Sequence, residues 1–141
     1  MRAFARGVVA AIAAVALVGC ESAPGADPVA ARPYLVSVDA PDDVPSGEVT
    51  GTLAVADDCI VVETDDAGTL FPLFAVRASF GPLDSGGRPT VDVAGERLLL
   101  GDEVVFAGGT GAVSDGVRST YPGVDFTRCR YDGFAILGEV R

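Results

Sequence analysis

From residue 44 onward, short runs of β-branched and apolar residues alternate with clusters of turn-forming residues. Val49, Gly51, Leu53 and Val55 interleave with threonine and alanine, which is the period of two expected of a strand with one buried face. In chain order, the predicted strands cover 49–56, 59–64, 70–76, 90–93, 97–100, 103–107 and 134–140. No stretch of this region has the spacing of an amphipathic helix. We therefore expect an all-β domain over 44–141.

A small antiparallel β-barrel of the OB-like or SH3-like type suits these short strands. An open sheet leaves edges that invite aggregation, and closure removes them. The stretch 98–109 (LLLGDEVVFAGG) predicts a strand pair with a turn at Gly101 and Asp102, and its glycines permit tight coiling. The stretch 112–122 is polar and rich in glycine and serine, so we expect a long exposed loop.

The first twenty residues have the layout of an export signal. Arg2 and Arg6 precede an apolar run over 8–18, which is shorter than the roughly 20 residues needed to span a membrane. The run ends in Leu17-Val18-Gly19-Cys20, which resembles the lipobox of bacterial lipoproteins. The resemblance implies that a signal peptide over 1–19 is removed and that Cys20 carries a diacylglycerol group. An ordinary signal peptide with a chance cysteine is the alternative.

The segment 20–43 is predicted to be a flexible tether that follows the lipidated cysteine, because it is rich in proline and has no helical period. Its stretch 34–38 (YLVSV) is either an edge strand or a loosely packed segment. The turn and core pattern further along also resembles that of exported bacterial lipoproteins of unknown function. The positions that carry this resemblance are Gly51 and Leu53, 59–61, Phe71-Pro72, 101–104 and Gly108-Gly109. The resemblance implies a fold and a location, and no activity.

Three cysteines fit an exported, lipid-anchored chain. If Cys20 is lipidated, Cys59 and Cys129 remain, and two cysteines outside the cytoplasm favour a disulfide. Two buried free thiols, or one reactive thiol beside Arg128 and Arg130, are the alternatives.

Composition excludes several classes of function. The 141 residues contain no Lys, His or Trp, and their formal net charge is −10. The usual general base, the commonest metal ligand and the Schiff-base amine are therefore missing. Such an acidic chain is also unsuited to nucleic acid, whose phosphates are bound by Lys and Arg. No cofactor and no resident metal are expected.

The most visible charged feature is a set of acidic turns at Asp57-Asp58 and Asp65-Asp66, with Glu63 between them. They allow a Ca²⁺- or small-ligand-binding domain as one alternative and a carboxylate-based hydrolase as another. The two pairs lie at opposite ends of the strand predicted over 59–64, so they cannot converge on one ion without other loops. Solvated turn charges are the simpler explanation.

A basic and aromatic group near the C-terminus is the candidate contact surface. Its members are Arg118, Tyr121, Arg128, Arg130 and Tyr131. Arg and Tyr are favoured at interfaces, but the arginines are expected first of all to form ion pairs with the chain's own carboxylates, and a contact surface is the second interpretation. We expect a non-enzymatic binding module, held by its lipid at the extracytoplasmic face of the cell membrane. The residues leave open whether its partner is an envelope protein or a small ligand.

Overall fold

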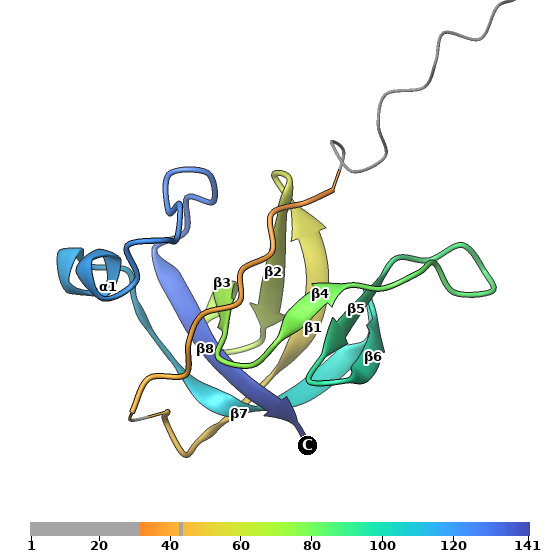
Figure 1. Cartoon of the computed structure of the whole chain (residues 1–141), viewed down its shortest axis with the longest axis horizontal. Coiled ribbons are helices and arrows are strands. Elements are labelled where there is room, and N and C mark those ends of the chain that lie inside the picture. Colours follow the sequence, from red (N-terminus) through yellow and green to blue (C-terminus); the bar gives the residue numbers. More distant parts are fainter. Residues whose placement is uncertain (1–31, 43) are drawn as a thin grey trace, which may run out of the picture. The chain divides into compact units, whose positions relative to one another are not determined.

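Strands make up nearly all the regular structure of residues 32–42 and 44–141, which are the residues that the computed structural model describes (Figure 1). The elements are β1 (Glu48–Ala56), β2 (Cys59–Thr64), β3 (Gly68–Phe74), β4 (Ala78–Phe80), β5 (Thr90–Val93), β6 (Glu96–Leu99), β7 (Glu103–Ala112), α1 (Asp115–Thr120) and β8 (Gly133–Val140). The all-β prediction is confirmed. The predicted signal peptide, Cys20 and the tether up to residue 31 lie outside the described residues.

Five of the strands pair in a closed ring. The order is β1-β2-β3-β8-β7, and β7 returns to β1. Every pairing is antiparallel except that of β3 with β8, which is parallel, so the wholly antiparallel arrangement predicted from the sequence is wrong at this pair. A parallel pair needs a long connection between its strands. The chain between β3 and β8 provides it with a separate three-stranded sheet and with β7.

β1 closes the ring because its two halves have different neighbours. Residues 48–52 pair with β7, and residues 52–56 pair with β2. Gly51 lies where the strand passes between them, and a Cβ at this position would meet the carbonyl oxygen of Glu63 at 2.7 Å. The close approach therefore requires glycine. The buried face predicted for this strand ends before Val55, whose residue is 48% exposed.

Apolar side chains from the ring and from the β4-β5-β6 sheet share one interior, the inner cluster. Its buried members are Val49, Leu53, Ile60, Val62, Leu70, Phe74, Val91, Val93, Leu98, Val104, Phe106, Ala135 and Leu137. Phe74 and Phe106 meet edge to face, with their ring centroids 6.2 Å apart. Strands β5 and β6 thus complete the ring's interior instead of forming a core of their own.

The second sheet contains a tight hairpin, β5 with β6, formed by the strands predicted over 90–93 and 97–100. Ala94 and Gly95 form its turn at positive φ, 52° and 87°, as a two-residue hairpin turn requires. The strand pair predicted over 98–109 is wrong, because β6 pairs with β5 whereas β7 pairs with β1 and β8. β7 also continues through its glycines to Ala112, beyond the predicted end of this strand at 107. Its pairing with β8 has a register shift between Phe106 and Gly108.

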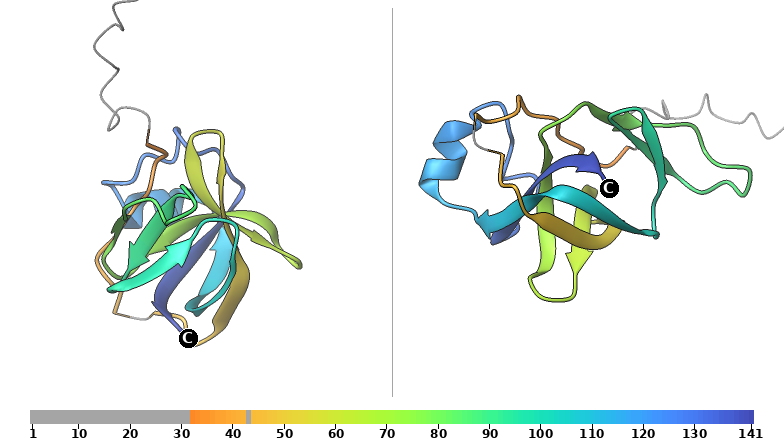
Figure 2. Two further views of the ribbon diagram at one scale, coloured as in Figure 1. Left: turned by 90° about the vertical axis from the view of Figure 1, so that its right-hand side faces the viewer. Right: turned by 90° about the horizontal axis from the view of Figure 1, so that it is seen from below.

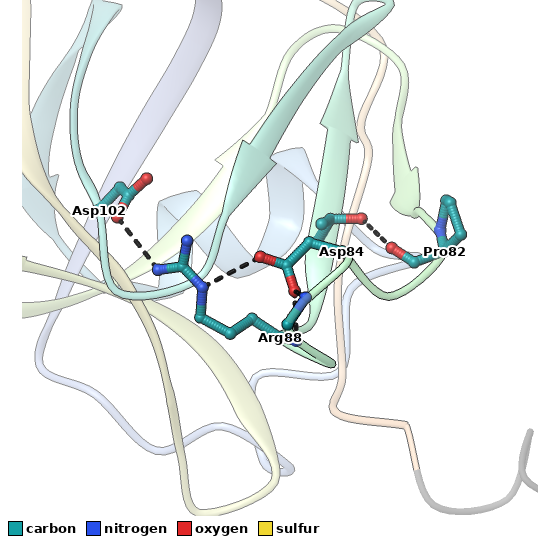
Figure 3. A network of polar contacts seen from close by, with 6 residues as sticks. Pro82, Asp84, Arg88 and Asp102 are labelled. Carbon is teal, nitrogen blue, oxygen red and sulfur yellow. Dashed lines mark hydrogen bonds and ion pairs between the residues drawn. The ribbon is translucent and has the colours of Figure 1, made fainter.

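One carboxylate organises the loop between β4 and β5 (Figure 3). Asp84 accepts hydrogen bonds from the backbone N–H and from Nε of Arg88, at 2.7 and 3.1 Å, and Arg88 lies 3.7 Å from Asp102. The Thr90 hydroxyl donates to the carbonyl oxygen of Pro82 at 2.6 Å. The bonds from Arg88, above all the backbone one, lower the pKa of Asp84 below its ordinary value.

The segment that precedes β1 joins the ring. Tyr34 bridges Cys59 at the start of β2, and Ser37 bridges Phe74 at the end of β3, both in parallel. β2 and β3 pair only further along, at Val62 with Leu70 and beyond, so the segment fills the space where the two strands diverge. Figure 1 shows it in orange, running along this side of the ring. The tether predicted up to residue 43 therefore ends earlier than expected: 34–38 belong to the folded domain.

Candidate binding surface

The candidate surface is built on the connection between β7 and β8, residues 113–132. Figure 2 shows that α1, within this connection, and the β4-β5-β6 sheet lie at opposite ends of the fold. Ser114 caps α1 by accepting a hydrogen bond from the backbone N–H of Val117 at 3.3 Å, as an N-terminal serine is suited to do. The exposed loop expected over 112–122 is therefore wrong in part, because six of its residues form a helix.

A second carboxylate folds the chain after α1. Asp125 accepts hydrogen bonds from the backbone N–H of Thr127 at 3.0 Å, from its hydroxyl at 2.6 Å and from the backbone N–H of Arg128 at 3.3 Å. These bonds, with that of the Thr127 hydroxyl the largest cause, lower the pKa of Asp125. The backbone N–H of Asp125 in turn donates to the Tyr34 hydroxyl at 3.0 Å. This hydrogen bond joins the connection to the segment that precedes β1.

The predicted disulfide between Cys59 and Cys129 is confirmed, with its Cα atoms 6.0 Å apart. Both residues are buried in a second group of apolar side chains on the outer side of β2 and β3, the outer cluster. Its buried members are Val36, Cys59, Val61, Phe71, Leu73, Phe126, Cys129 and Phe134. Tyr121 and Tyr131, which the sequence placed on an exposed patch, are half-buried against this cluster. Their rings therefore support the connection as well as border its surface.

The three arginines of the predicted patch are fixed by aromatic rings and backbone instead of carboxylates. The guanidinium carbon of Arg128 lies 4.8 Å from the ring centroid of Tyr34, and that of Arg118 lies 5.6 Å from the centroid of Phe126. Arg130 donates from Nε to the carbonyl oxygen of Thr127 at 3.2 Å. None of the three has a carboxylate oxygen within 4.0 Å among residues 32–42 and 44–141. The prediction that these arginines form internal ion pairs is therefore wrong for the described residues.

Part of the predicted patch surrounds an open hollow of about 350 Å³, the arginine hollow. It is lined by Arg118, Phe126, Thr127, Arg130, Tyr131 and Asp132. Of the residues grouped from the sequence, the structure brings Arg118, Arg130 and Tyr131 together in this hollow. Sequence reasoning missed Thr127 and Asp132, which directly flank 128–131 in the sequence. It also placed Arg128 here, although that side chain lies over Tyr34.

The Tyr131 phenol borders the turn between β1 and β2. Its hydroxyl lies 3.4 Å from the carbonyl oxygen of Ala56, to which it donates. Burial, and after it the negative charge of Asp57, raise the pKa of Tyr131 above its ordinary value. Tyr131 therefore stays protonated, and acts as a hydrogen-bond donor, over the physiological range of pH.

A larger open hollow of about 890 Å³ lies on the other side of the connection, where Tyr121 is found. Its lining comes from three separate segments, 36–42, 75–77 and 120–124. Nothing in the sequence indicates it, because its walls meet only after the segment before β1 has docked. Its charged lining residues are Asp39, Asp42 and Arg77.

The acidic turns stay apart, as their positions in the sequence indicate. Asp57 and Asp58 form the turn before β2, both at positive φ (50° and 58°), and Asp65 and Asp66 follow its end. Within the described ranges, no three His, Cys, Asp or Glu side chains are grouped so as to hold a metal ion. No helix of the described part is long and apolar enough to cross a membrane.

Comparison with family models, with curated proteins and with solved structures finds no match to this chain.

Proposed function

We propose that the chain is a lipid-anchored protein of the extracytoplasmic face of the cell membrane. In this proposal its β domain is a non-enzymatic binding module for an envelope protein or a small ligand. The observation that carries the proposal is the Cys59–Cys129 disulfide. It uses both cysteines of the folded domain, favours an oxidising compartment, and leaves Cys20 of the lipobox-like stretch as the one remaining thiol of the sequence.

We propose further that the ring is a barrel of the OB type instead of the SH3 type. Numbered by their order within the ring, the strands pair as 1-2-3-5-4 and back to 1, and the third and fifth are parallel. This order and this single parallel pair are those of OB folds, whose ligands bind near the loops between strands 1 and 2 and between strands 4 and 5. The corresponding parts here are the Asp57-Asp58 turn and the connection 113–132. Tyr131 belongs to the connection, and its hydroxyl donates to the carbonyl oxygen of Ala56 beside the Asp57-Asp58 turn. The two loops therefore lie next to each other, which supports the connection as the contact surface.

Cell fractionation tests the anchor. The Cys20→Ser variant should lose membrane association or accumulate with its signal attached, because two acyl chains provide stable attachment and the cysteine is their only carrier. The control is the double variant Cys59→Ala/Cys129→Ala, which removes the other two cysteines without burying hydroxyls and should remain in the membrane fraction. Unchanged membrane partition and processing of Cys20→Ser would refute lipid anchoring.

A pull-down from solubilised membranes tests the binding role. The wild-type protein should retain a specific partner, or show a ligand-induced rise in melting temperature. Removing an aromatic side chain of the connection, as in Tyr131→Ala, or a basic one, as in Arg130→Gln, should reduce that retention. Recovery of no specific partner, together with no thermal shift, would count against a binding module.

A further inference from the structure

The arginine hollow carries charges of both signs that do not neutralise one another. Arg118 and Arg130 line it together with Asp132, yet no nitrogen of either arginine is within 4.0 Å of a carboxylate oxygen of any described residue. Elsewhere in the described domain, Arg88, Arg97 and Arg141 do pair with carboxylates. The hollow thus keeps two cations and one anion available to a third group.

Each of the two exposed guanidinium groups is restrained by one contact before any ligand arrives. Arg118 lies over the Phe126 ring, 5.6 Å from its centroid, and Arg130 is bonded through Nε to the Thr127 carbonyl at 3.2 Å. The Nη nitrogens of Arg130 have no partner among the hydrogen bonds of the described residues. A guanidinium presents its donors in a planar fork that matches a carboxylate. Fixing two such groups in advance lowers the entropy lost on binding.

The sign of Asp132 limits what the arginines accept. A phosphate that carries two negative charges is repelled by a carboxylate in the same hollow, whereas an ammonium group is attracted to it. The Phe126 and Tyr131 rings give the hollow an apolar wall, and its volume of about 350 Å³ is at the lower end of the range for small-molecule sites. The lining therefore matches a small molecule with both charges and an apolar part.

We infer that the arginine hollow binds a small zwitterion, namely an amino acid or the free ends of a short peptide. Arg118 and Arg130 bind its carboxylate, Asp132 binds its ammonium group, and Tyr131 contacts its apolar side chain. This inference rests on the proposed function, since it names the ligand class of a binding module. It does not depend on the lipid anchor.

Titration calorimetry of the full-length protein in detergent tests the inference with four probes. Phenylalanine carries both charges, phenylpropionate lacks the ammonium group, phenethylamine lacks the carboxylate, and glycylphenylalanine separates the two charges along a peptide. Phenylalanine or the dipeptide should bind at least tenfold more tightly than either singly charged probe, because each of those probes lacks one of the two charged contacts; tenfold corresponds to about 1.4 kcal/mol. Which of the two binds more tightly distinguishes a free amino acid from a peptide.

Matched variants assign the contacts. Arg118→Gln and Arg130→Gln should each weaken binding of phenylalanine and of phenylpropionate, whereas Asp132→Asn should weaken phenylalanine and leave phenylpropionate equal or tighter. Arg97→Gln is the control, because Arg97 pairs with Asp92 on the other sheet and its loss should change no probe's affinity. A urea unfolding curve for each variant identifies any that fail to fold, and Arg118→Lys, which keeps the charge, replaces Arg118→Gln in that case.

Two results would overturn the inference. One is that no zwitterionic probe binds at millimolar concentration to a protein shown to be folded. The other is that the singly charged probes bind as tightly as phenylalanine. Failure of the anchor would show instead in fractionation of Cys20→Ser, with zwitterion binding intact, so the two proposals fail separately.

Discussion

Loss of the disulfide is the perturbation whose size the structure sets most directly. Cys59 begins β2, and Cys129 is 70 positions away at the end of the connection. The chain-entropy treatment of a closed loop of this length gives about 4 kcal/mol of stabilisation through the unfolded state. A domain of this size has a total stability of about 5–15 kcal/mol. We therefore expect the double variant Cys59→Ala/Cys129→Ala to lose a large share of its free energy of unfolding.

Urea unfolding followed by circular dichroism measures the loss. With a slope of about 1–2 kcal/mol per M urea, the midpoint should fall by about 2–4 M. Alanine avoids burying a hydroxyl at positions that are 0% and 2% exposed. Wild-type protein with its disulfide reduced is a second comparison, which loses the crosslink but keeps both sulfur atoms. Cys20→Ser is the matched control and should leave the midpoint unchanged, since Cys20 is not part of the pair.

The loss should also be local. Amide hydrogen exchange over 121–132 should accelerate more than exchange in β1, because the disulfide attaches the connection to β2 and the remaining attachment is chiefly the outer cluster and the Tyr34 hydroxyl. A loss of less than about 1 kcal/mol in the free energy of unfolding would contradict the loop-closure estimate. Equal acceleration in β1 and in the connection would refute the local role of the crosslink.

Three further outcomes are expected. Gly108→Ala should destabilise the domain by about 1–3 kcal/mol in urea unfolding, because a Cβ there would collide with the backbone of β8. Gly123→Ala is the control and should be near neutral, because it has open space around it. Equal effects of the two variants would contradict the close approach of β7 to β8 at Gly108. Tyr34→Ala should cost about 2 kcal/mol, since its ring stacks 6.0 Å from that of Phe71, and an unchanged midpoint would mean that the segment before β1 does not stabilise the fold. In a ¹³C carboxyl titration the Asp84 carboxyl should have its midpoint below 3.8, because its hydrogen bonds lower its pKa. These bonds stabilise the loop at pH values above the ordinary pKa, and their contribution is lost as the pH falls through the lowered pKa. A midpoint at or above 3.8 would refute them.

The ring could be predicted in outline because its strands carry local signals. The alternation around Gly51 and Leu53, the apolar run of β2 and the final strand β8 each need one buried face or two, and hydrophobic spacing reports that directly. The Cys59–Cys129 pair followed from counting thiols. The pairing of the strands and its direction could not be predicted in the same way. The spacing of residues within a strand does not indicate which strand lies beside it or whether the two are parallel.

The parts that sequence reasoning misplaced depend on tertiary contacts. For 34–38 the sequence left open an edge strand or a loosely packed segment, and its bridges to β2 and β3 follow from the divergence of those two strands, which no local pattern reports. α1 has no buried residue, so its six residues have no apolar face for a pattern to reveal. Asp132 directly follows Tyr131 in the sequence, but its place beside Arg118 in the arginine hollow depends on how the whole connection folds, which no local spacing reports.

The central claim, an exported β domain anchored by a lipid on Cys20, is tested most directly by the mass of the N-terminal peptide of protein purified from membranes. The account predicts a peptide that begins at Cys20 and carries the mass of a diacylglyceryl group. A peptide that runs unmodified from Leu17 through Cys20 to Glu21 would contradict it.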